Sequence, residues 1–287
     1  MVKTQSNLYK ESGKAVLKKW LCTATAVLIG ACFLFPLYWL FITSLKSDTE
    51  IMAKTLTYFP QTVVFDAWKE QIKDAMFLNS LKNSAVIAIT AMCISLSLGI
   101  PAAYAMGRFR LPGQKVILLV FLVTQMMPSS LLLTPLYLTF AKAGLLNTYI
   151  APAMAVASGS IPFIVITLRP YFMNLPKSLD EAARIDGCNA FTSFLFIMVP
   201  TIKTGIITVL AISFLHGWND LAYSMTFNTN SDMRPLTANI YKFMDKYGMR
   251  WNCIMAYGLV LVVPVVTAFV FLQKYIVGGM TAGAVKE

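Results

Sequence analysis

Residues 175–187 have the sequence LPKSLDEAARIDG and separate two long apolar runs of the chain. Ser178 and Glu181 have the spacing of a capping box, in which each side chain bonds to the backbone N–H of the other residue. Asp180 and Glu181 carry negative charge that suits the first turn of a helix, where the helix dipole is positive. Gly187 suits the left-handed backbone that ends many helices. The pattern therefore predicts a short, charged, well-capped helix between two apolar segments.

The apolar segments around this helix are long enough to cross a membrane. A charge at the bilayer centre costs about 2.5–3.5 kcal/mol on insertion scales, so an interval without charged residues is the clearest sign of a span. Five such intervals of 23–26 residues occur, at residues 20–45, 83–107, 116–141, 143–168 and 251–273. Each exceeds the roughly 20 residues that a helix needs to cross the hydrocarbon core. The sequence predicts a membrane-spanning helix at each of these places.

A sixth apolar stretch, residues 187–217, is divided by Lys203. Because a lysine near a helix end can extend its ammonium group to the membrane surface, we expect a span at about residues 204–221. Residues 187–202 would then form an interfacial amphipathic stretch, whereas a seventh span there would place the termini on opposite sides. The prediction is an all-α membrane protein with a six-helix transmembrane domain at residues 20–274.

The distribution of basic residues predicts the orientation of these spans. Residues 1–19 hold five lysines against one acidic residue, and residues 108–115 hold three basic residues and no acidic one. Clusters of lysine and arginine favour the cytoplasmic side of a membrane. We therefore expect both termini in the cytoplasm, with residues 1–19 and 275–287 as short cytoplasmic segments.

Composition excludes several classes of function. Hydrophobic residues make up 57% of the chain and charged residues 13%, against about 25% charged residues in a soluble domain. The net charge of +11 comes from basic residues scattered between apolar runs, so it indicates membrane topology and no nucleic-acid partner. The five cysteines lack the spacing of metal ligands, so we expect isolated thiols and no metal site.

The sequence contains no signature of an energy source. It has no GxxxxGK[ST] phosphate loop, no GxSxG or HExxH pattern, and His216 is its single histidine. Ion-coupled carriers usually need ionisable groups within the membrane, and here only His216 and Asp220, at one end of the fifth span, qualify. We expect a passage that is no enzyme and is driven by a partner, with a stand-alone secondary carrier or channel as the alternative.

The helix at residues 175–187 also carries a resemblance to a known family. Glu181-Ala182-Ala183, then Gly187, then an apolar run ending in Val199-Pro200 resembles the EAA loop of membrane subunits of binding-protein-dependent ABC importers. The resemblance implies the ABC type I importer permease fold, with a coupling loop at about residues 170–203 that docks in a cleft of an ATPase subunit. The residues it assigns to ATPase coupling are Glu181, Ala182, Ala183, Arg184, Asp186 and Gly187.

Further segments are similar to the carbohydrate-uptake, maltose-permease-like branch of that family. They are PLYW at 36–39, TSLK at 43–46, AAYA at 102–105, GLLNTY at 144–149, FLHGWND at 214–220 and GGMTAGAVK at 278–286. The resemblance implies import of a sugar or oligosaccharide into a bacterial or archaeal cell across the cytoplasmic membrane, with a non-sugar solute as the alternative. The implied partners are a second related permease, two ATPase subunits that bind ATP and Mg, an extracytoplasmic solute-binding protein and membrane lipid. No cofactor is expected in this chain.

Sugars are often held by aromatic faces and side-chain amides, which makes one end of the fifth span a candidate substrate pathway. The candidates are His216, Trp218, Asn219 and Asp220. The alternatives are a packed helix residue for His216 and an interfacial anchor for Trp218. Residues 225–250 form a long connection that is either a surface loop or, by resemblance, a segment that reaches toward the external binding protein.

Overall fold

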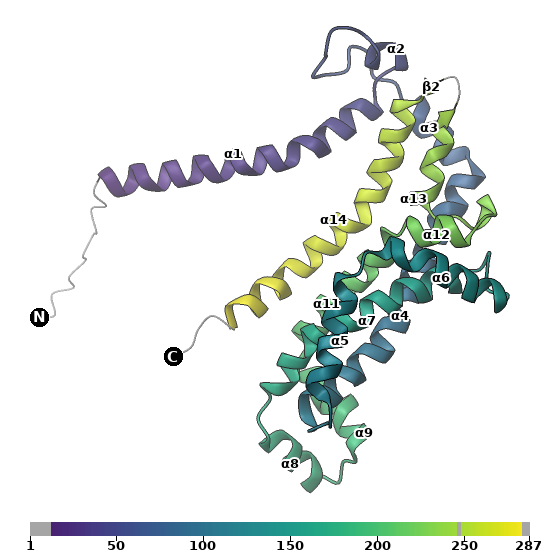
Figure 1. Ribbon diagram of the computed structural model, residues 1–287. Coiled ribbons are helices and arrows are strands. Elements are labelled where there is room, and N and C mark those ends of the chain that lie inside the picture. Colours follow the sequence, from purple (N-terminus) through teal and green to yellow (C-terminus); the bar gives the residue numbers. More distant parts are fainter. Residues whose placement is uncertain (1–12, 246–247, 283–287) are drawn as a thin grey trace, which may run out of the picture. The chain divides into compact units, whose positions relative to one another are not determined.

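A computed structural model describes residues 13–245 and 248–282, and nearly all of its regular structure is helical (Figure 1). Within those residues the only strands are β1 (Met244–Asp245) and β2 (Gly248–Met249), which pair antiparallel. The predicted cytoplasmic segments, residues 1–19 and 275–287, lie partly outside the described residues. The described parts of both continue helices, because α1 begins at Gly13 and α14 ends at Ala282.

The chain divides into two compact units. The first comprises residues 1–68 and 250–259, and the second comprises residues 69–249 and 260–287. The first unit contains α1 (Gly13–Ser44), α2 (Asp48–Ile51), the loop that follows, and the beginning of α14 (Trp251–Ala282). The chain passes from the first unit to the second between residues 68 and 69, within helix α3 (Asp66–Lys73).

The second unit is built around two long helices, α4 (Ala75–Arg108) and α7 (Ile150–Met173), which share the most extensive helix contact of the described chain. Helix α11 (Lys203–Trp218) packs on both of them, and α5 (Gln114–Met126) packs on α7. Their shared core contains Ala103, Met106, Ile164, Val165, Leu168, Phe172, Met198, Ile202 and Val209. This bundle carries the coupling loop, residues 170–203.

Small residues allow these helices to approach closely. A Cβ atom added to Gly217 of α11 would lie 2.7 Å from the Cα atom of Ala88 in α4. A Cβ atom added to Gly99 of α4 would lie 2.8 Å from the Cγ2 atom of Ile164 in α7. Helix pairs in membranes depend on such contacts, because lipid tails are as apolar as the side chains and give no hydrophobic drive to association.

Four of the predicted spans are single helices in the structure. Among residues 13–245 and 248–282, the helices long and apolar enough to cross a membrane are Leu17–Ser44, Ala75–Arg108, Ile150–Met173 and Trp251–Gln273. Two further pairs of helices pass the same test together but are bent, so that up to six spans result. The chain is therefore a multi-pass membrane protein.

The predicted single helix at residues 116–141 is two helices in the structure. Helix α5 ends at Met126 and α6 (Ser129–Lys142) begins two residues after Met127, with a bend of 100° between them. A residue that precedes proline is disfavoured in the helical region, and Met127, before Pro128, is accordingly extended, with φ −77° and ψ 125°. The local chemistry of this proline breaks the helix that hydropathy alone makes continuous.

Residues 187–202, the predicted interfacial amphipathic stretch, are helical over most of their length. They contain α9 (Ala190–Ser193), a π-helical turn at Phe194–Met198 and α10 (Val199–Thr201). Together these elements form one helical stretch, which meets α11 at 85°. Pro200 cannot donate a backbone hydrogen bond, and the π-helical turn ends at Met198, two residues before it. Lys203 is exposed and is the first residue of α11, which agrees with the predicted start of the fifth span.

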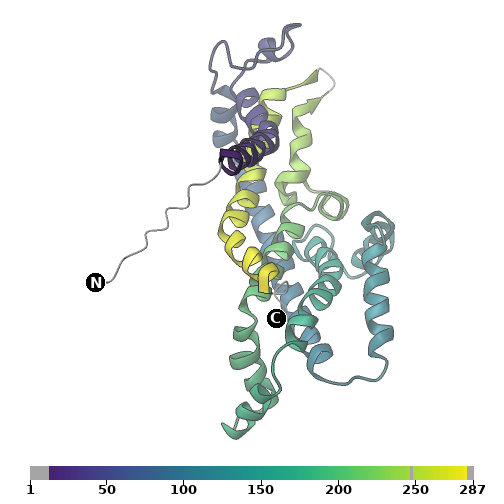
Figure 2. The same cartoon turned by 90° about the vertical axis from the view of Figure 1, so that its left-hand side faces the viewer.

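The described part of the long connection at residues 225–250 is folded and is not a plain surface loop. We call residues 222–249 the cap segment. Its described elements are α12 (Ala222–Phe227), the 3₁₀ turns Ser231–Met233 and Ile240–Phe243, α13 (Leu236–Asn239), β1 and β2. In the second unit the cap segment lies at one end of α4, and α8 (Ser178–Ile185) and α9 lie at the other (Figures 1 and 2).

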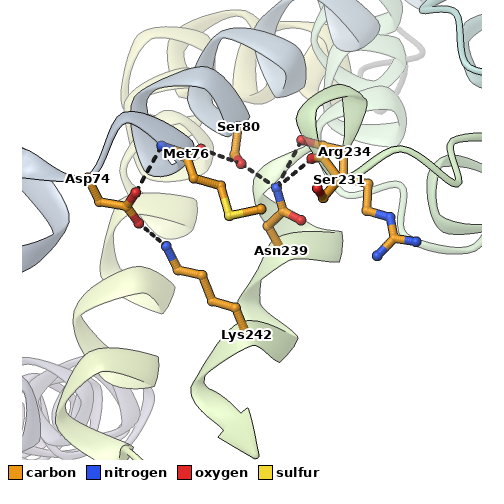
Figure 3. Close-up of polar contacts among 7 residues, drawn as sticks. All are labelled: Asp74, Met76, Ser80, Ser231, Arg234, Asn239 and Lys242. Carbon is orange, nitrogen blue, oxygen red and sulfur yellow. Dashed lines mark hydrogen bonds and ion pairs between the residues drawn. The ribbon is translucent and has the colours of Figure 1, made fainter.

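A buried polar stripe on α4 holds the cap segment in place. Asn83 donates to the carbonyl oxygens of Asp232 (2.7 Å) and Arg234 (3.0 Å), and the backbone N–H of Leu236 donates to Ser84 Oγ (2.8 Å). In Figure 3 the Asn239 amide likewise donates to Ser80 Oγ at 2.6 Å, and Lys242 pairs with Asp74 at the start of α4. Two carbonyls of the cap segment, one of its N–H groups and two of its side chains therefore bond to α4 or to the residue that precedes it.

Candidate functional site

The predicted helix in the coupling loop is present as α8, but its first turn differs from the prediction. Lys177 occupies the N-cap position with helical angles, and no side chain caps this end of the helix. The backbone N–H groups of Asp180 and Glu181 bond to the carbonyl oxygen of Lys177, at 3.0 and 3.3 Å. Because the turn already begins at Pro176, Ser178 lies inside it and cannot act as the cap. The capping box is wrong.

The end of α8 agrees with the prediction. Gly187 has a left-handed backbone, with φ +78°. The N–H of Cys188 bonds to the carbonyl oxygen of Ala183 (2.9 Å), and the N–H of Gly187 bonds to that of Arg184 (3.1 Å). These two bonds form a Schellman motif. No atom lies within 4 Å of a Cβ atom added at Gly187, so the backbone conformation alone demands glycine there.

The two alanines that are adjacent in the sequence lie on different faces of α8. Ala183 is 1% exposed and packs inward, whereas Ala182 is exposed. Ile185, which sequence reasoning missed, is 85% exposed, three residues after Ala182 and therefore on the same side of the helix. An isoleucine in an otherwise polar helix was the available signal. We call the exposed residues of this helix end the tip surface: Glu181, Ala182, Arg184, Ile185 and Asp186.

Arg108, the last residue of α4, anchors the base of α8. Its guanidinium group donates to the carbonyl oxygens of Leu175 (2.7 Å), Phe172 (3.3 Å) and Pro176 (3.4 Å), and it forms an ion pair with Asp180. The Arg108 side chain is only 8% exposed. The planar fork of an arginine suits such a set of acceptors. In the sequence Arg108 indicates only membrane topology, because 72 residues separate it from Asp180.

Aromatic packing reinforces this anchor. The ring of Tyr104 in α4 contacts the rings of Phe109 (5.6 Å), Phe172 (5.4 Å) and Phe194 (4.9 Å between centroids). The coupling loop is thus fixed to the ends of both long helices of the second unit. Its tip surface is left exposed, and the Glu181 carboxylate makes no ion pair with the described residues. This geometry is suited to passing a displacement at the tip surface into α4 and α7.

The substrate-pathway candidates at the end of α11 separate into two kinds. Trp218 is buried, stacks on Phe214 and donates its indole N–H to the carbonyl oxygen of Leu261 at 3.0 Å. His216 is exposed, and its Nδ1 atom lies 3.1 Å from Ser160 Oγ. Trp218 thus has a packing role, whereas the histidine ring remains accessible.

Asp220 and Asn219 follow the end of α11. The Asp220 carboxylate accepts hydrogen bonds from the backbone N–H of Tyr223 (3.3 Å) and from both the N–H (2.8 Å) and the hydroxyl (2.7 Å) of Ser224. It therefore caps the first turn of α12. Asn219 is exposed. No hydrogen bond of the described chain joins any two of these four candidates, so they do not form one constellation.

Comparison with known proteins places this geometry in a family. The model of the family "Binding-protein-dependent transport system inner membrane component" matches residues 95–282, which include the coupling loop and the cap segment. The diacetylchitobiose uptake system permease protein of Streptomyces coelicolor is 28% identical over 91% of this chain and 95% of that protein. The trehalose/maltose transport system permease protein of Thermococcus litoralis is 30% identical over 94% of this chain and 98% of that protein.

Solved structures share the fold. A chain of a bacterial ABC transporter involved in the import of the acidic polysaccharide alginate has a TM-score of 0.78, with 21% identity over 92% of this chain and 98% of that chain. A chain of the MetNI methionine ABC transporter has a TM-score of 0.54, with 16% identity over 70% of this chain and 94% of that chain. The family match covers more than half of the chain, and this protein therefore belongs to the binding-protein-dependent transport system inner membrane components, the permease subunits of ABC importers.

Proposed function

We propose that this chain forms half of the passage of an ATP-driven importer of a sugar or oligosaccharide, and that the tip surface of α8 docks on an ATPase subunit. The proposal rests on one observation at α8. The tip surface of this helix is exposed, whereas Arg108 fixes its other end to the bundle. Relatives named for diacetylchitobiose, trehalose/maltose and arabinooligosaccharide transport support the carbohydrate class. ATP and Mg would bind to the ATPase subunits, and this chain would be no enzyme.

The proposed topology has six spans, with each bent helix pair counted as one span and both termini in the cytoplasm. The tip surface would then face the cytoplasm and the cap segment would face the outside of a bacterial or archaeal cytoplasmic membrane. Two observations support this orientation. Arg108, which begins the basic stretch 108–115, bonds to the coupling loop, and the cap segment lies at the opposite end of the same unit (Figures 1 and 2).

The proposed mechanism is alternating access. Closure of two ATPase subunits on ATP displaces the tip surface, and the bonds of Arg108 carry that displacement into α4 and α7. The ATPase can shift the permease between its inward- and outward-facing states only to the extent that it binds the two states with different affinity. A rigid link between the tip surface and the bundle would place the tip surface differently in the two states, so that the ATPase binds them with different affinity.

The remaining partners in the proposal are a second, related permease and an extracytoplasmic solute-binding protein. The cap segment is the surface that would meet the binding protein, and it exposes the apolar side chains of Tyr241, Met244 and Met249. Of the four substrate-pathway candidates, His216 and Asn219 remain available to a passing sugar. Trp218 and Asp220 would act by fixing α11 and α12 in place.

The proposal is tested by straining Gly187 without altering the rest of the assembly. We expect Gly187→Val to reduce ATP-dependent sugar uptake by reconstituted transporter at least tenfold, because a β-branched residue is strained at positive φ and would distort the end of α8. Gly113→Val is the matched control, because Gly113 has φ +72° and equally open surroundings but lies outside the coupling loop. Equal uptake by the two variants would contradict docking through α8.

A second measurement separates the proposed function from the alternative of a stand-alone carrier. The chain is purified in mild detergent, and the co-purifying subunits are identified. An ATPase and a second permease are expected. Ion-driven sugar flux by the chain alone in liposomes would instead favour the carrier.

A further inference from the structure

The loop between α6 and α7, residues 143–149, is bonded to the cap segment. It contains the GLLNTY stretch at 144–149, which has no part in the proposed mechanism. Asn147 of this stretch has a left-handed backbone, with φ +56°, and is the only non-glycine residue with positive φ among residues 13–245 and 248–282. Such a conformation persists only where the surrounding contacts fix it. The contacts of Asn147 therefore indicate what the loop holds.

Asn147 bonds to the turn that follows α12 in the cap segment. Its backbone N–H donates to the carbonyl oxygen of Phe227 at 3.0 Å. Its Oδ1 atom accepts from Thr229 Oγ1 at 3.1 Å and from the backbone N–H of Asn230 at 2.9 Å. Phe227 is fully buried, and its ring meets that of Phe140 in α6 edge to face, at 5.3 Å between centroids. One residue of the loop thus positions the whole turn at residues 227–230.

Tyr149, the residue before α7, connects the same loop to α4. Its hydroxyl group donates to Asn83 Oδ1 at 2.8 Å. Asn83 is fully buried, and its amide nitrogen donates to the carbonyl oxygens of Asp232 and Arg234 in the cap segment. A buried amide needs partners for its oxygen as well as its nitrogen. Tyr149 supplies the partner of the oxygen, so that α4, the start of α7 and the cap segment meet at one side chain.

These bonds attach the cap segment to both long helices of the second unit. At the other end of the same two helices, Arg108 of α4 bonds to the carbonyl oxygen of Phe172 in α7 and to the coupling loop. The cap segment and the coupling loop are therefore fixed to opposite ends of one helix pair (Figures 1 and 2). A displacement that α4 and α7 carry from the tip surface reaches the cap segment if the cap segment follows both helices.

We propose that Asn147 and Tyr149 are positioning residues for transport, which make the cap segment move with α7 as well as with α4. The inference rests on the proposed function for alternating access and for the docking of a solute-binding protein on the cap segment. That protein can distinguish the two states of the permease only if the cap segment differs between them. Asn147 and Tyr149 supply this difference without contact with the solute.

Single substitutions remove these bonds with little other change. Asn147→Gly removes the Oδ1 acceptor, and glycine adopts positive φ freely. Tyr149→Phe removes only the hydroxyl donor. Asn147→Asp is the conservative variant, because both side-chain bonds end on Oδ1 and a carboxylate oxygen is also an acceptor. Thr148→Val is the matched control, because the Thr148 hydroxyl group donates to Leu145 (2.6 Å) and accepts from the N–H of Ala151 (3.4 Å), both outside the cap segment.

The first measurement tests whether these bonds hold the cap segment. The complete transporter in nanodiscs carries spin labels at Ile150→Cys and Tyr241→Cys in a cysteine-free background, since both side chains are exposed. Electron–electron double resonance should give one narrow distance distribution. Asn147→Gly combined with Tyr149→Phe should broaden it about twofold, as expected of a segment that has lost contacts, and Thr148→Val should not. An unchanged width in the combined variant overturns the inference.

The second measurement tests transport, with proteoliposomes that hold the assembly and its solute-binding protein. Trehalose, maltose and diacetylchitobiose are the sugars offered. The combined variant should lower ATP-dependent uptake at least about fivefold, the lower range of coupling between sites, while ATP hydrolysis without the binding protein stays within about twofold of the wild type. Asn147→Asp alone should retain the uptake of the wild type, whereas Asn147→Gly alone should lose part of it.

Thermal unfolding of each variant separates positioning from a structural role. Thr148→Val should lower the melting temperature and leave uptake unchanged. Uptake that falls in parallel with the melting temperature in every variant, Thr148→Val included, overturns the inference. If the wild-type assembly imports sugar and the combined variant imports it equally well, only this inference fails. If the wild-type assembly hydrolyses ATP but imports no solute, the proposed function fails and this inference fails with it.

Discussion

Arg108 shows how a single residue can fix one end of a helix. Its guanidinium group contacts three carbonyl oxygens and the carboxylate of Asp180, and these five residues together form the base of α8. Hydrogen bonds to a charged group contribute about 1.5–3 kcal/mol each. Removal of the charge would therefore loosen the base without touching the tip surface.

We predict that Arg108→Gln separates ATP hydrolysis from transport. ATPase activity of the assembly should persist, while ATP-dependent uptake falls about tenfold, which corresponds to about 1.4 kcal/mol of lost coupling. Arg108→Lys should rescue only part of the loss, because an ammonium group cannot reproduce the arginine fork. Arg110→Gln is the control, since Arg110 is exposed and outside this network. Parallel loss of both activities would contradict a positioning role.

The ion pair of Asp74 and Lys242 predicts a pH-dependent contribution to stability. Burial raises the pKa of Asp74, but the hydrogen bond and charge of Lys242 and the N–H of Met76 outweigh it, so the pKa lies below its usual 3.8. A depressed pKa stabilises the fold above the unfolded value, and that stability is lost as the pH falls through the folded pKa. The pair is partly exposed, so its contribution is about 0–1 kcal/mol.

The corresponding measurement compares thermal unfolding of the wild type with that of Lys242→Gln. The variant should melt at a lower temperature near neutral pH, and the difference should shrink progressively below pH 3.8. Lys177→Gln serves as a control for the loss of one lysine, since Lys177 is exposed at the coupling loop. A difference that grows on acidification would contradict the assigned sign.

At the scale of elements, the packing of α11 on α4 depends on Gly217. A methyl group there would come within 2.7 Å of the backbone of Ala88, and backbone cannot move aside cheaply. We predict that Gly217→Ala destabilises the protein by about 1–3 kcal/mol, the usual cost of overpacking. The check is chemical denaturation of the purified chain in detergent.

Gly159 on α7 is the matched control for this prediction. A Cβ atom added there meets nothing within 4 Å, and glycine within a helix costs about 1 kcal/mol relative to alanine. Gly159→Ala adds the same methyl group as Gly217→Ala, but it should leave the stability of the protein unchanged or raise it. A similar loss of stability in both variants would show that the cost is not a steric one at the α4 contact.

At the scale of the whole molecule, the proposed topology predicts opposite accessibility for the two ends of the second unit. In a cysteine-free background, Ile185→Cys in the tip surface should react with an impermeant maleimide only after the cell is opened. Met249→Cys in the cap segment should react in intact cells, after removal of any outer barrier. Both side chains are exposed in the structure, so a failure to react reflects the side of the membrane. Reversed labelling would overturn the orientation.

The sequence predicted most helices because the interactions that determine where they begin and end involve residues close together in the chain. The cost of charge in lipid positions the spans, and the need for positive φ at Gly187 ends α8. Prediction failed where two local signals competed. At residues 116–141 hydropathy favoured one helix while Pro128 imposed a bend, and at Ser178 the turn had already begun at Pro176.

What the sequence by itself determined is therefore the membrane class, the approximate spans, the short helix that ends at Gly187 and the family resemblance, since each depends on neighbours along the chain. The tertiary structure alone decided that Arg108 anchors α8, that Ala183 faces inward while Ile185 faces outward, and that Asn147 bonds to the cap segment. These facts depend on contacts between residues far apart in sequence. Only packing brings such residues together, and no local pattern records which of them will meet.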